Sequence, residues 1–223
     1  MCATRSLVGG SKQLVAFKNA LVSMYRSNPR LANAFTGCAT FFMGDVLAQK
    51  IELEKTKRED GYDLVRAAQV GLLGIVMNGF FIHHWYHGLD KVVGSSMTSK
   101  VVVGMKVAAD QLIYAPFSIA SFFYFTSFRK TGDITEANKE FMPKMESLFV
   151  QTFAADCALW PLANFVNFRF VTLTYRPTFT AVVQLMWQTY MSATSSNSHV
   201  EVREREMCPE AGTALVLCKN TIK

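Results

Sequence analysis

The chain lacks the short motifs that mark common catalytic and metal-binding sites. Its 223 residues contain no P-loop, no GxGxxG, HExxH or GxSxG pattern, and no serine or cysteine arranged with a histidine as a nucleophile. The five cysteines are an odd number without a CxxC pair, which argues against a disulfide framework and a zinc site. We therefore expect a protein that is not an enzyme and that uses no cofactor.

Charge is also scarce, because only 18% of the residues are charged whereas 50% are hydrophobic. The net charge is +6, but no run of five or more basic residues occurs, so no DNA binding is expected. The 18 phenylalanines and 11 methionines favour a protein that lies in a lipid bilayer. Basic flanks of membrane spans explain the positive charge in the same way.

Four apolar segments are long enough to cross a bilayer, which takes about 20 residues of helix. They cover residues 31–51, 65–88, 101–128 and 148–171. A shorter helix is expected over 177–192, either as a fifth crossing or packed against the others. The predicted fold is an all-α, multi-span transmembrane helical bundle over residues 29–194, followed by a polar, disordered tail over 195–223.

The segment 1–28 is basic and amphipathic, and the first 44 residues contain no acid. Such a start is typical of a mitochondrial targeting segment. It is equally typical of a helix that stays on the membrane surface in the mature protein. Both interpretations stay open.

Polar side chains inside the apolar segments are the candidate functional residues, because groups in lipid need water or one another. Asp156 and Asn164 share one face of the fourth segment, and Lys106 is spaced to pair with Asp110 along the third. The alternative is that these groups only hold helices together. The candidate pore-lining or intramembrane polar residues are Asp45, Gln49, Lys106, Asp110, Gln111, Asp156, Asn164 and Asn167.

Two further patterns concern packing and metals. Small residues four apart, Ala67 with Gly71 and Gly104 with Ala108, are suited to close helix contact in lipid. His83 and His87 share a helix face, but without a third ligand nearby we expect interfacial packing and no bound metal.

Four spaced elements together resemble one known family. The first contains Tyr25, Pro29, Gly37, Gly44-Asp45 and Gln49, and the second is His83-x-Trp85-Tyr86. The third contains Lys106, Asp110-Gln111 and Pro116. The last contains Trp160-Pro161, Asn167-Phe168, Val171, Tyr175-Arg176, Trp187 and Tyr190-Met191-Ser192. This arrangement resembles the Mpv17/PMP22 family of small multi-span proteins of the mitochondrial inner membrane and the peroxisomal membrane.

The resemblance has departures from the family pattern. Thr172 stands where the family usually has a proline, Cys157 where it usually has a tryptophan, and Phe80 where a proline commonly follows Gly79. Two helix kinks and one membrane anchor are therefore in doubt.

The resemblance implies a channel-like protein that serves mitochondrial homeostasis, through metabolite flux and mitochondrial DNA maintenance. Its expected location is the mitochondrial inner membrane, with the peroxisomal membrane as the alternative. Besides the bilayer, the expected partners are a second copy of the chain and the large subunit of the mitochondrial ribosome. The ribosomal subunit is an expected partner because Asn33, Gly37-Cys38 and Leu89-Asp90 resemble the branch called Mpv17-like two. That resemblance implies an assembly factor for the mitochondrial ribosome, without transport.

Overall fold

The structure is a computed structural model that describes residues 19, 22–56, 61–94, 99–170 and 176–207. Within these ranges the chain is helical apart from short connections, and it contains no strand. This confirms the predicted all-α class. The elements are α2 (Pro29–Thr56), α3 (Leu64–Gly74), η1 (Ile75–Phe81), α4 (Ile82–Val92), α5 (Lys100–Ala109), η2 (Asp110–Tyr114), α6 (Ala115–Thr131), α7 (Ile134–Phe170) and α8 (Arg176–Met207).

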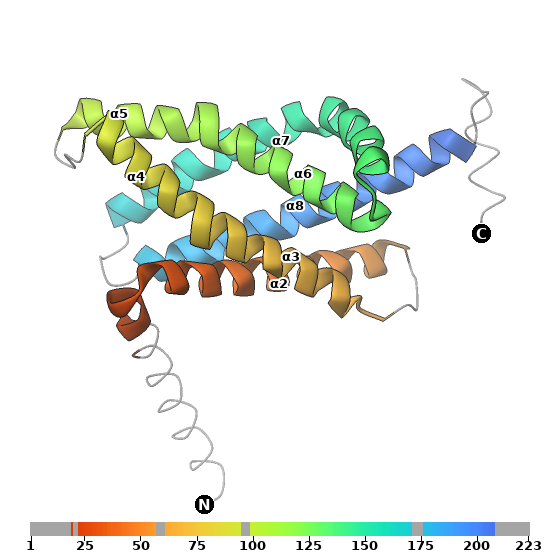
Figure 1. Cartoon of the computed structure of the whole chain (residues 1–223), viewed down its shortest axis with the longest axis horizontal. Coiled ribbons are helices and arrows are strands. Elements are labelled where there is room, and N and C mark those ends of the chain that lie inside the picture. Colours follow the sequence, from red (N-terminus) through yellow and green to blue (C-terminus); the bar gives the residue numbers. More distant parts are fainter. Residues whose placement is uncertain (1–18, 20–21, 57–60, 95–98, 171–175, 208–223) are drawn as a thin grey trace, which may run out of the picture.

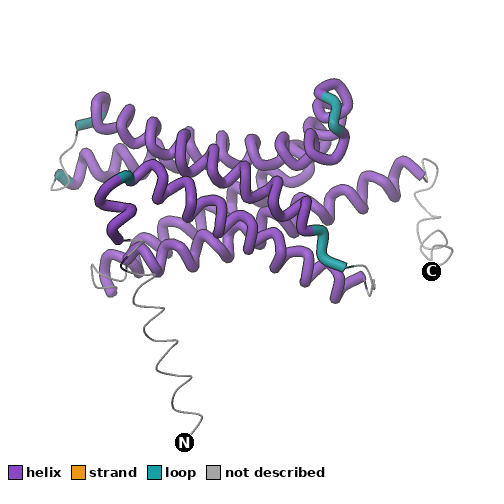
Figure 2. The backbone as a smooth tube through the Cα atoms, turned by 60° about the horizontal axis from the view of Figure 1, so that its bottom comes forward, coloured by secondary structure: helices purple, strands orange, loops and turns teal. Residues whose placement is uncertain are grey.

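These elements form five helical traverses that run back and forth along the long axis of the molecule (Figure 1). The first, fourth and fifth traverses are α2, α7 and α8. The second is α3, η1 and α4 in sequence, and the third is α5, η2 and α6. The tube view confirms that each three-part traverse is one uninterrupted helical path (Figure 2).

The helix ends follow from local sequence. The side chain of Asp63 caps the start of α3 by accepting a hydrogen bond from the Arg66 N–H at 2.8 Å. Gly132 ends α6 with φ of 69°, a left-handed conformation that glycine adopts without steric cost. Asp133 then accepts hydrogen bonds from the first turn of α7. Gly132 and Asp133 therefore form the connection between α6 and α7.

Two other boundaries differ from expectation. Helix α8 continues to Met207, well past the predicted end at 192, so residues 195–207 are helical where a disordered tail was expected. The short π-helical element η2 interrupts the third traverse directly before Pro116, which occupies the first turn of α6. The irregular turn accommodates the proline, because proline is tolerated in the first turn of a helix.

Glycines allow α2 to pack closely against the second traverse. A Cβ built on Gly37 would collide with the carbonyl oxygen of Gly74, and one built on Gly79 would collide with Ala34. Gly71 of the predicted small-residue pair lies against Cys38. A Cβ on Gly104 would meet nothing within 4 Å, so the predicted use of Gly104 in helix contact was wrong for the described chain.

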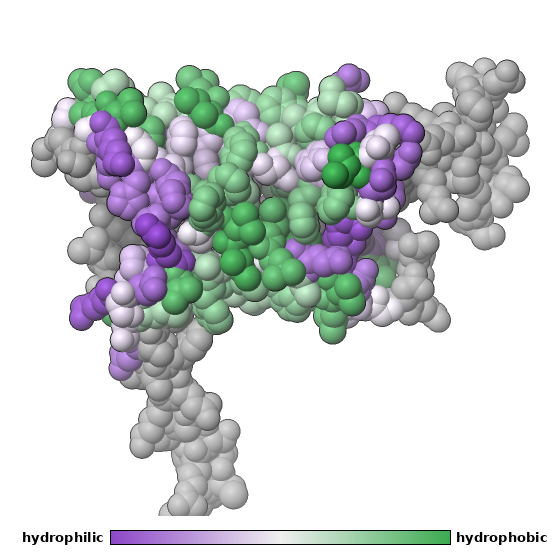
Figure 3. Space-filling model, in the orientation of Figure 1, coloured by the Kyte–Doolittle hydropathy of each residue, from purple (hydrophilic) through white to green (hydrophobic). Residues whose placement is uncertain are grey.

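The bundle exposes large apolar side chains, and it buries several polar ones beside its apolar core. Large hydrophobic residues are exposed on every traverse, whereas Asp45, Gln49 and Asp156 are buried. Figure 3 shows apolar residues across the middle of one face and hydrophilic residues gathered toward both ends. Two helices, Pro29–Thr56 and Leu64–Val92, are long and apolar enough to cross a membrane. This distribution is the one expected for a helical bundle in lipid.

Candidate functional site

The bundle encloses a cavity of about 350 Å³, which lies between all five traverses. Its walls combine apolar and aromatic side chains with a few polar groups, the usual character of a small-molecule site. Four of the eight candidate polar residues line it: Asp110, Gln111, Asp156 and Asn164. The sequence therefore identified much of the polar lining, although it did not reveal a cavity.

Asp156 is the most buried acid of the cavity, at 3% exposed. The side chains of Gln111 and Trp160 face its carboxyl group. Its Oδ2 atom nevertheless has no hydrogen-bond partner among the described residues, and neither does the Oε1 atom of Gln111 or Gln188. The cavity thus presents several buried acceptor oxygens whose hydrogen-bonding capacity is unused.

Asp110 connects two of the sequence elements that carried the family resemblance. Its Oδ1 atom accepts a hydrogen bond from Trp85 Nε1 at 2.6 Å, and its Oδ2 atom accepts a longer one from the Tyr86 hydroxyl at 3.4 Å. The expected Lys106–Asp110 pair was wrong, because Lys106 Nζ lies 2.5 Å from Asp90 Oδ1. Lys106 reaches back to the end of α4, and both its partner and its own ammonium group lie outside the cavity lining.

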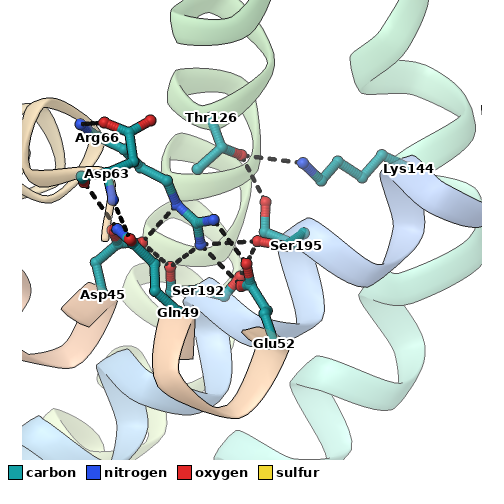
Figure 4. A network of polar contacts seen from close by, with 10 residues as sticks. Asp45, Gln49, Glu52, Asp63, Arg66, Thr126, Lys144, Ser192 and Ser195 are labelled. Atoms are coloured by element: carbon teal, nitrogen blue, oxygen red, sulfur yellow. Dashed lines mark hydrogen bonds and ion pairs between the residues drawn. The ribbon is translucent and has the colours of Figure 1, made fainter. Parts of the chain in front are cut away.

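A second group of polar residues lies away from this cavity and is centred on Arg66 (Figure 4). Arg66 Nε donates to Asp45 Oδ1 at 3.0 Å, and its two terminal nitrogens hold Glu52 at 2.8 and 2.9 Å. Arg66 also donates to Ser196 at 2.8 Å, while Ser192 donates to Asp45. We call these five residues the Arg66 network. It joins α2, α3 and α8.

Gln49 extends the Arg66 network toward the loop before α3. Its amide nitrogen donates to Asp45 Oδ2 at 2.7 Å, and its amide oxygen accepts from the backbone N–H of Asp63 at 2.7 Å. Asp45 is fully buried, and both of its carboxylate oxygens are satisfied. Asp45 and Gln49 therefore lie in a saturated structural network and do not line the main cavity.

A neighbouring contact adds α6 and α7 to this end of the bundle. Lys144 Nζ donates to Thr126 Oγ1 at 3.0 Å, and Thr126 shares a hydrogen bond of 2.8 Å with Ser195 (Figure 4). The sequence reasoning missed Arg66 and Lys144. Arg66 carried a signal, since a basic residue at the start of an apolar segment invites an acidic partner, but the identity of that partner depends on the fold.

The remaining predicted residues have varied positions. His83 and His87 stack edge to face at 4.4 Å between ring centroids, and no group of three potential metal ligands occurs among the described residues. Gly44 lies against Gln188 of α8, which explains the need for a small residue. Trp160, Pro161 and Trp187 line the cavity. The side chains of Asn167, Phe168, Tyr175 and Arg176 lie outside the described residues.

Comparison with known proteins supports the resemblance seen in the motifs. A family model described as Mpv17 / PMP22 family matches residues 134–192, which cover α7 and the first half of α8. No solved structure matches the chain significantly.

Relatives align over most of the chain. It is similar to PXMP2/4 family protein 4 of Dictyostelium discoideum, with 27% identity over 84% of this chain and 99% of the relative. Protein SYM1 of Saccharomyces cerevisiae is 29% identical over 82% of this chain and 90% of the relative. A relative from Drosophila melanogaster, 25% identical over 76% of this chain and 97% of its own length, is named mitochondrial inner membrane protein Mpv17. The predicted location agrees with that name. The chain is thus similar to the Mpv17/PMP22 family in α7 and the first half of α8, and to PXMP2/4, SYM1 and Mpv17 membrane proteins over most of its length.

Proposed function

We propose that the protein is a channel-like protein of the mitochondrial inner membrane, and that a solute passes through the cavity between its helices. The cavity carries this proposal, because it places polar groups from several helices inside a bundle whose outer surface is apolar. Polar groups inside membrane bundles tend to face a water-filled path or one another. The peroxisomal membrane remains the alternative location.

In this proposal all five traverses cross the membrane. Helix α2 and the segment Leu64–Val92 have the length and hydropathy for it. The other three traverses run beside them along the same axis, and each exposes large apolar side chains, among them Leu112, Phe165 and Met186 (Figure 1). With five crossings, the start of α2 and the end of α8 lie on opposite sides of the bilayer.

The Arg66 network closes one end of the path in this conformation. On two helices a member of the network follows a residue of the cavity wall by one helical turn: Asp45 follows Phe41, and Ser192 follows Gln188. The neighbouring Thr126 follows Phe122 in the same way. Passage therefore requires the apolar floor and the network beyond it to separate. A buried ion pair whose partners come from different helices is suited to holding such a closed state.

The direct test is single-channel recording from purified protein in planar bilayers, with a matched pair of bulky substitutions on the third traverse. Ser118 lines the cavity, so Ser118→Trp should reduce the conductance by filling the path. Leu112 is 71% exposed and outside the cavity, so Leu112→Trp should leave the conductance unchanged. Equal conductance in both variants, with both inserted and folded, would overturn the proposed path.

The alternative function is a membrane-bound assembly factor for the mitochondrial ribosome. Two of the residues that suggested it, Gly37 and Cys38, have a packing role here, because they lie against Gly74 and Gly71. The alternative predicts co-sedimentation with the large ribosomal subunit, weakened by neutralising Arg26 and Arg30. The assembly-factor function would be rejected if the protein conducts ions and stays at the top of a sedimentation gradient, apart from the ribosomal subunit.

A further inference from the structure

The main cavity has one sign of charge. Among the described residues that line it are two aspartates, Asp110 and Asp156, and no lysine, arginine or histidine. Lys106, the nearest base along the third traverse, is turned away and paired with Asp90. An acidic cavity in an apolar bundle attracts cations strongly, because the low dielectric of its surroundings screens charge poorly.

The cavity also holds polar atoms that nothing in the described chain satisfies. Asp156 and Gln188 are 3% and 5% exposed, and the Asp156 Oδ2 and Gln188 Oε1 atoms have no hydrogen-bond partner there. Leaving a buried carboxylate oxygen and an amide oxygen without donors is unfavourable. A ligand that brings positive charge and N–H or polarised C–H groups would remove this cost.

Six aromatic side chains complete the wall: Phe41, Tyr86, Tyr114, Phe122, Trp160 and Trp187. Trp160 is one helical turn from Asp156 and faces it. Aromatic rings next to a carboxylate form the kind of cage that recognises ammonium groups through cation–π attraction. An inorganic cation needs several oxygen ligands close together, whereas no group of three or more histidine, cysteine, aspartate or glutamate ligands occurs among the described residues.

We propose that this cavity binds an organic cation, a protonated or quaternary amine, with its charge next to Asp156 and its alkyl groups against Trp160 and Trp187. The proposal names the substrate class of the path proposed above and rests on that function for its transport meaning. The bound cation lies between the two aspartates and satisfies the acceptor oxygens of Asp156 and Gln188. The volume of about 350 Å³ accommodates a small amine.

Choline and its uncharged isostere 3,3-dimethylbutan-1-ol are the probes, since they differ in charge and hardly in shape. Binding to the full chain in lipid nanodiscs is measured by calorimetry and by tryptophan fluorescence, because Trp160 and Trp187 line the site. We expect choline to bind saturably and the alcohol to bind about tenfold more weakly or worse. Equal binding of the two probes would overturn the proposal, as would folded wild-type protein that binds neither.

The variants are Asp156→Asn and Asp110→Asn, with Glu136→Gln as the matched control. Each removes one negative charge, but Glu136 lies exposed at the start of α7, far from the cavity lining. Choline affinity should fall about tenfold or more in Asp156→Asn, and less in Asp110→Asn, whose carboxylate already has two donors. Unchanged affinity in both cavity variants would overturn the proposal, as would an equal loss in Glu136→Gln.

Binding and conduction separate this inference from the proposed function. Choline binding that depends on Asp156, in protein that conducts nothing, would support the site and reject the channel. Conduction that depends on Ser118, in protein that does not bind choline, would reject the site and leave the channel intact.

Discussion

Asp45 is the buried acid of the Arg66 network. Its carboxylate is fully buried and accepts hydrogen bonds from Arg66, Gln49 and Ser192. Asp45→Ala would leave the Arg66 guanidinium, only 14% exposed, with Glu52 as its remaining acidic partner. Removing one partner of a buried ion pair costs about 3–5 kcal/mol, so we expect a large drop in the thermal unfolding temperature of the purified protein.

A double variant distinguishes the buried charge from simple loss of packing. Adding Arg66→Met to Asp45→Ala removes the uncompensated cation, and stability should recover in part. This account of the Arg66 network would be contradicted if the double variant lost more unfolding free energy than the two single variants lose together.

Asp133 gives a pH dependence outside the membrane-spanning segments. Hydrogen bonds from the backbone N–H groups of Glu136 and Thr135 lower the pKa of its carboxyl group below the ordinary value near 4. A depressed folded-state pKa adds stability above the unfolded pKa, and that stability is lost as the pH falls through the folded one. The unfolding temperature of Asp133→Ala should therefore lie below that of the wild type at pH 7.

The gap between the two proteins should close as the pH falls below about 4, because the carboxylate becomes protonated in both folded and unfolded states. A gap that persists at lower pH would assign the effect to packing of the side chain and not to its charge.

The sequence points to costly polar positions but not to their partners. Polar residues inside apolar segments are visible in the sequence because they are costly there, so Asp110, Asp156 and Asn164 could be identified in advance. Their partners could not. Lys106 was assigned to Asp110 by helical spacing, but its ammonium group reaches Asp90, 16 residues earlier. Ser192 meets Asp45 across 147 residues, a pairing that only tertiary packing defines.

At the scale of elements, the contact between α2 and α3 provides a sharp comparison of two glycines. A Cβ on Gly74 would collide with the backbone of Gly37, whereas a Cβ on Gly104 would meet nothing within 4 Å. We expect Gly74→Ala to lower the unfolding temperature because the helices must move apart. Gly104→Ala should keep or raise it, since alanine favours a helix interior by roughly 0.5–1 kcal/mol over glycine.

The unfolding temperatures of both variants are measured in one thermal-shift experiment, in the same lipid. The reverse order, with Gly104→Ala the more damaging, would mean that the α5 surface packs against something, such as a second copy of the chain.

The sequence predicted where the helices lie, but it did not predict the π-helical element η1 or the full length of α8. Apolar runs of about 20 residues define where helices must lie, so four segments were placed correctly along the chain. The π-helical element η1 had no visible signal in the sequence, whereas Pro116 marks the place of η2 directly before it. The length of α8 was underestimated, because its polar second half resembles a tail until helix packing is known.

At the scale of the whole molecule, the arrangement of polarity supports a membrane bundle with an internal path. Apolar side chains face outward along all five traverses, while acids and amides from different helices meet inside. The sequence predicted both populations. It could not show that Asp45 and Asp156 belong to separate sites, because that division follows from how the helices are turned about their axes.

The most direct measurement is the water accessibility of the cavity in lipid vesicles. In a background without native cysteines, Ser118→Cys and Leu112→Cys are treated with a membrane-impermeant cationic thiosulfonate, and labelling and current are recorded. The account predicts rapid labelling of Ser118→Cys with loss of current, and little labelling of Leu112→Cys, which faces lipid. An inert Ser118→Cys beside a reactive Leu112→Cys would contradict it.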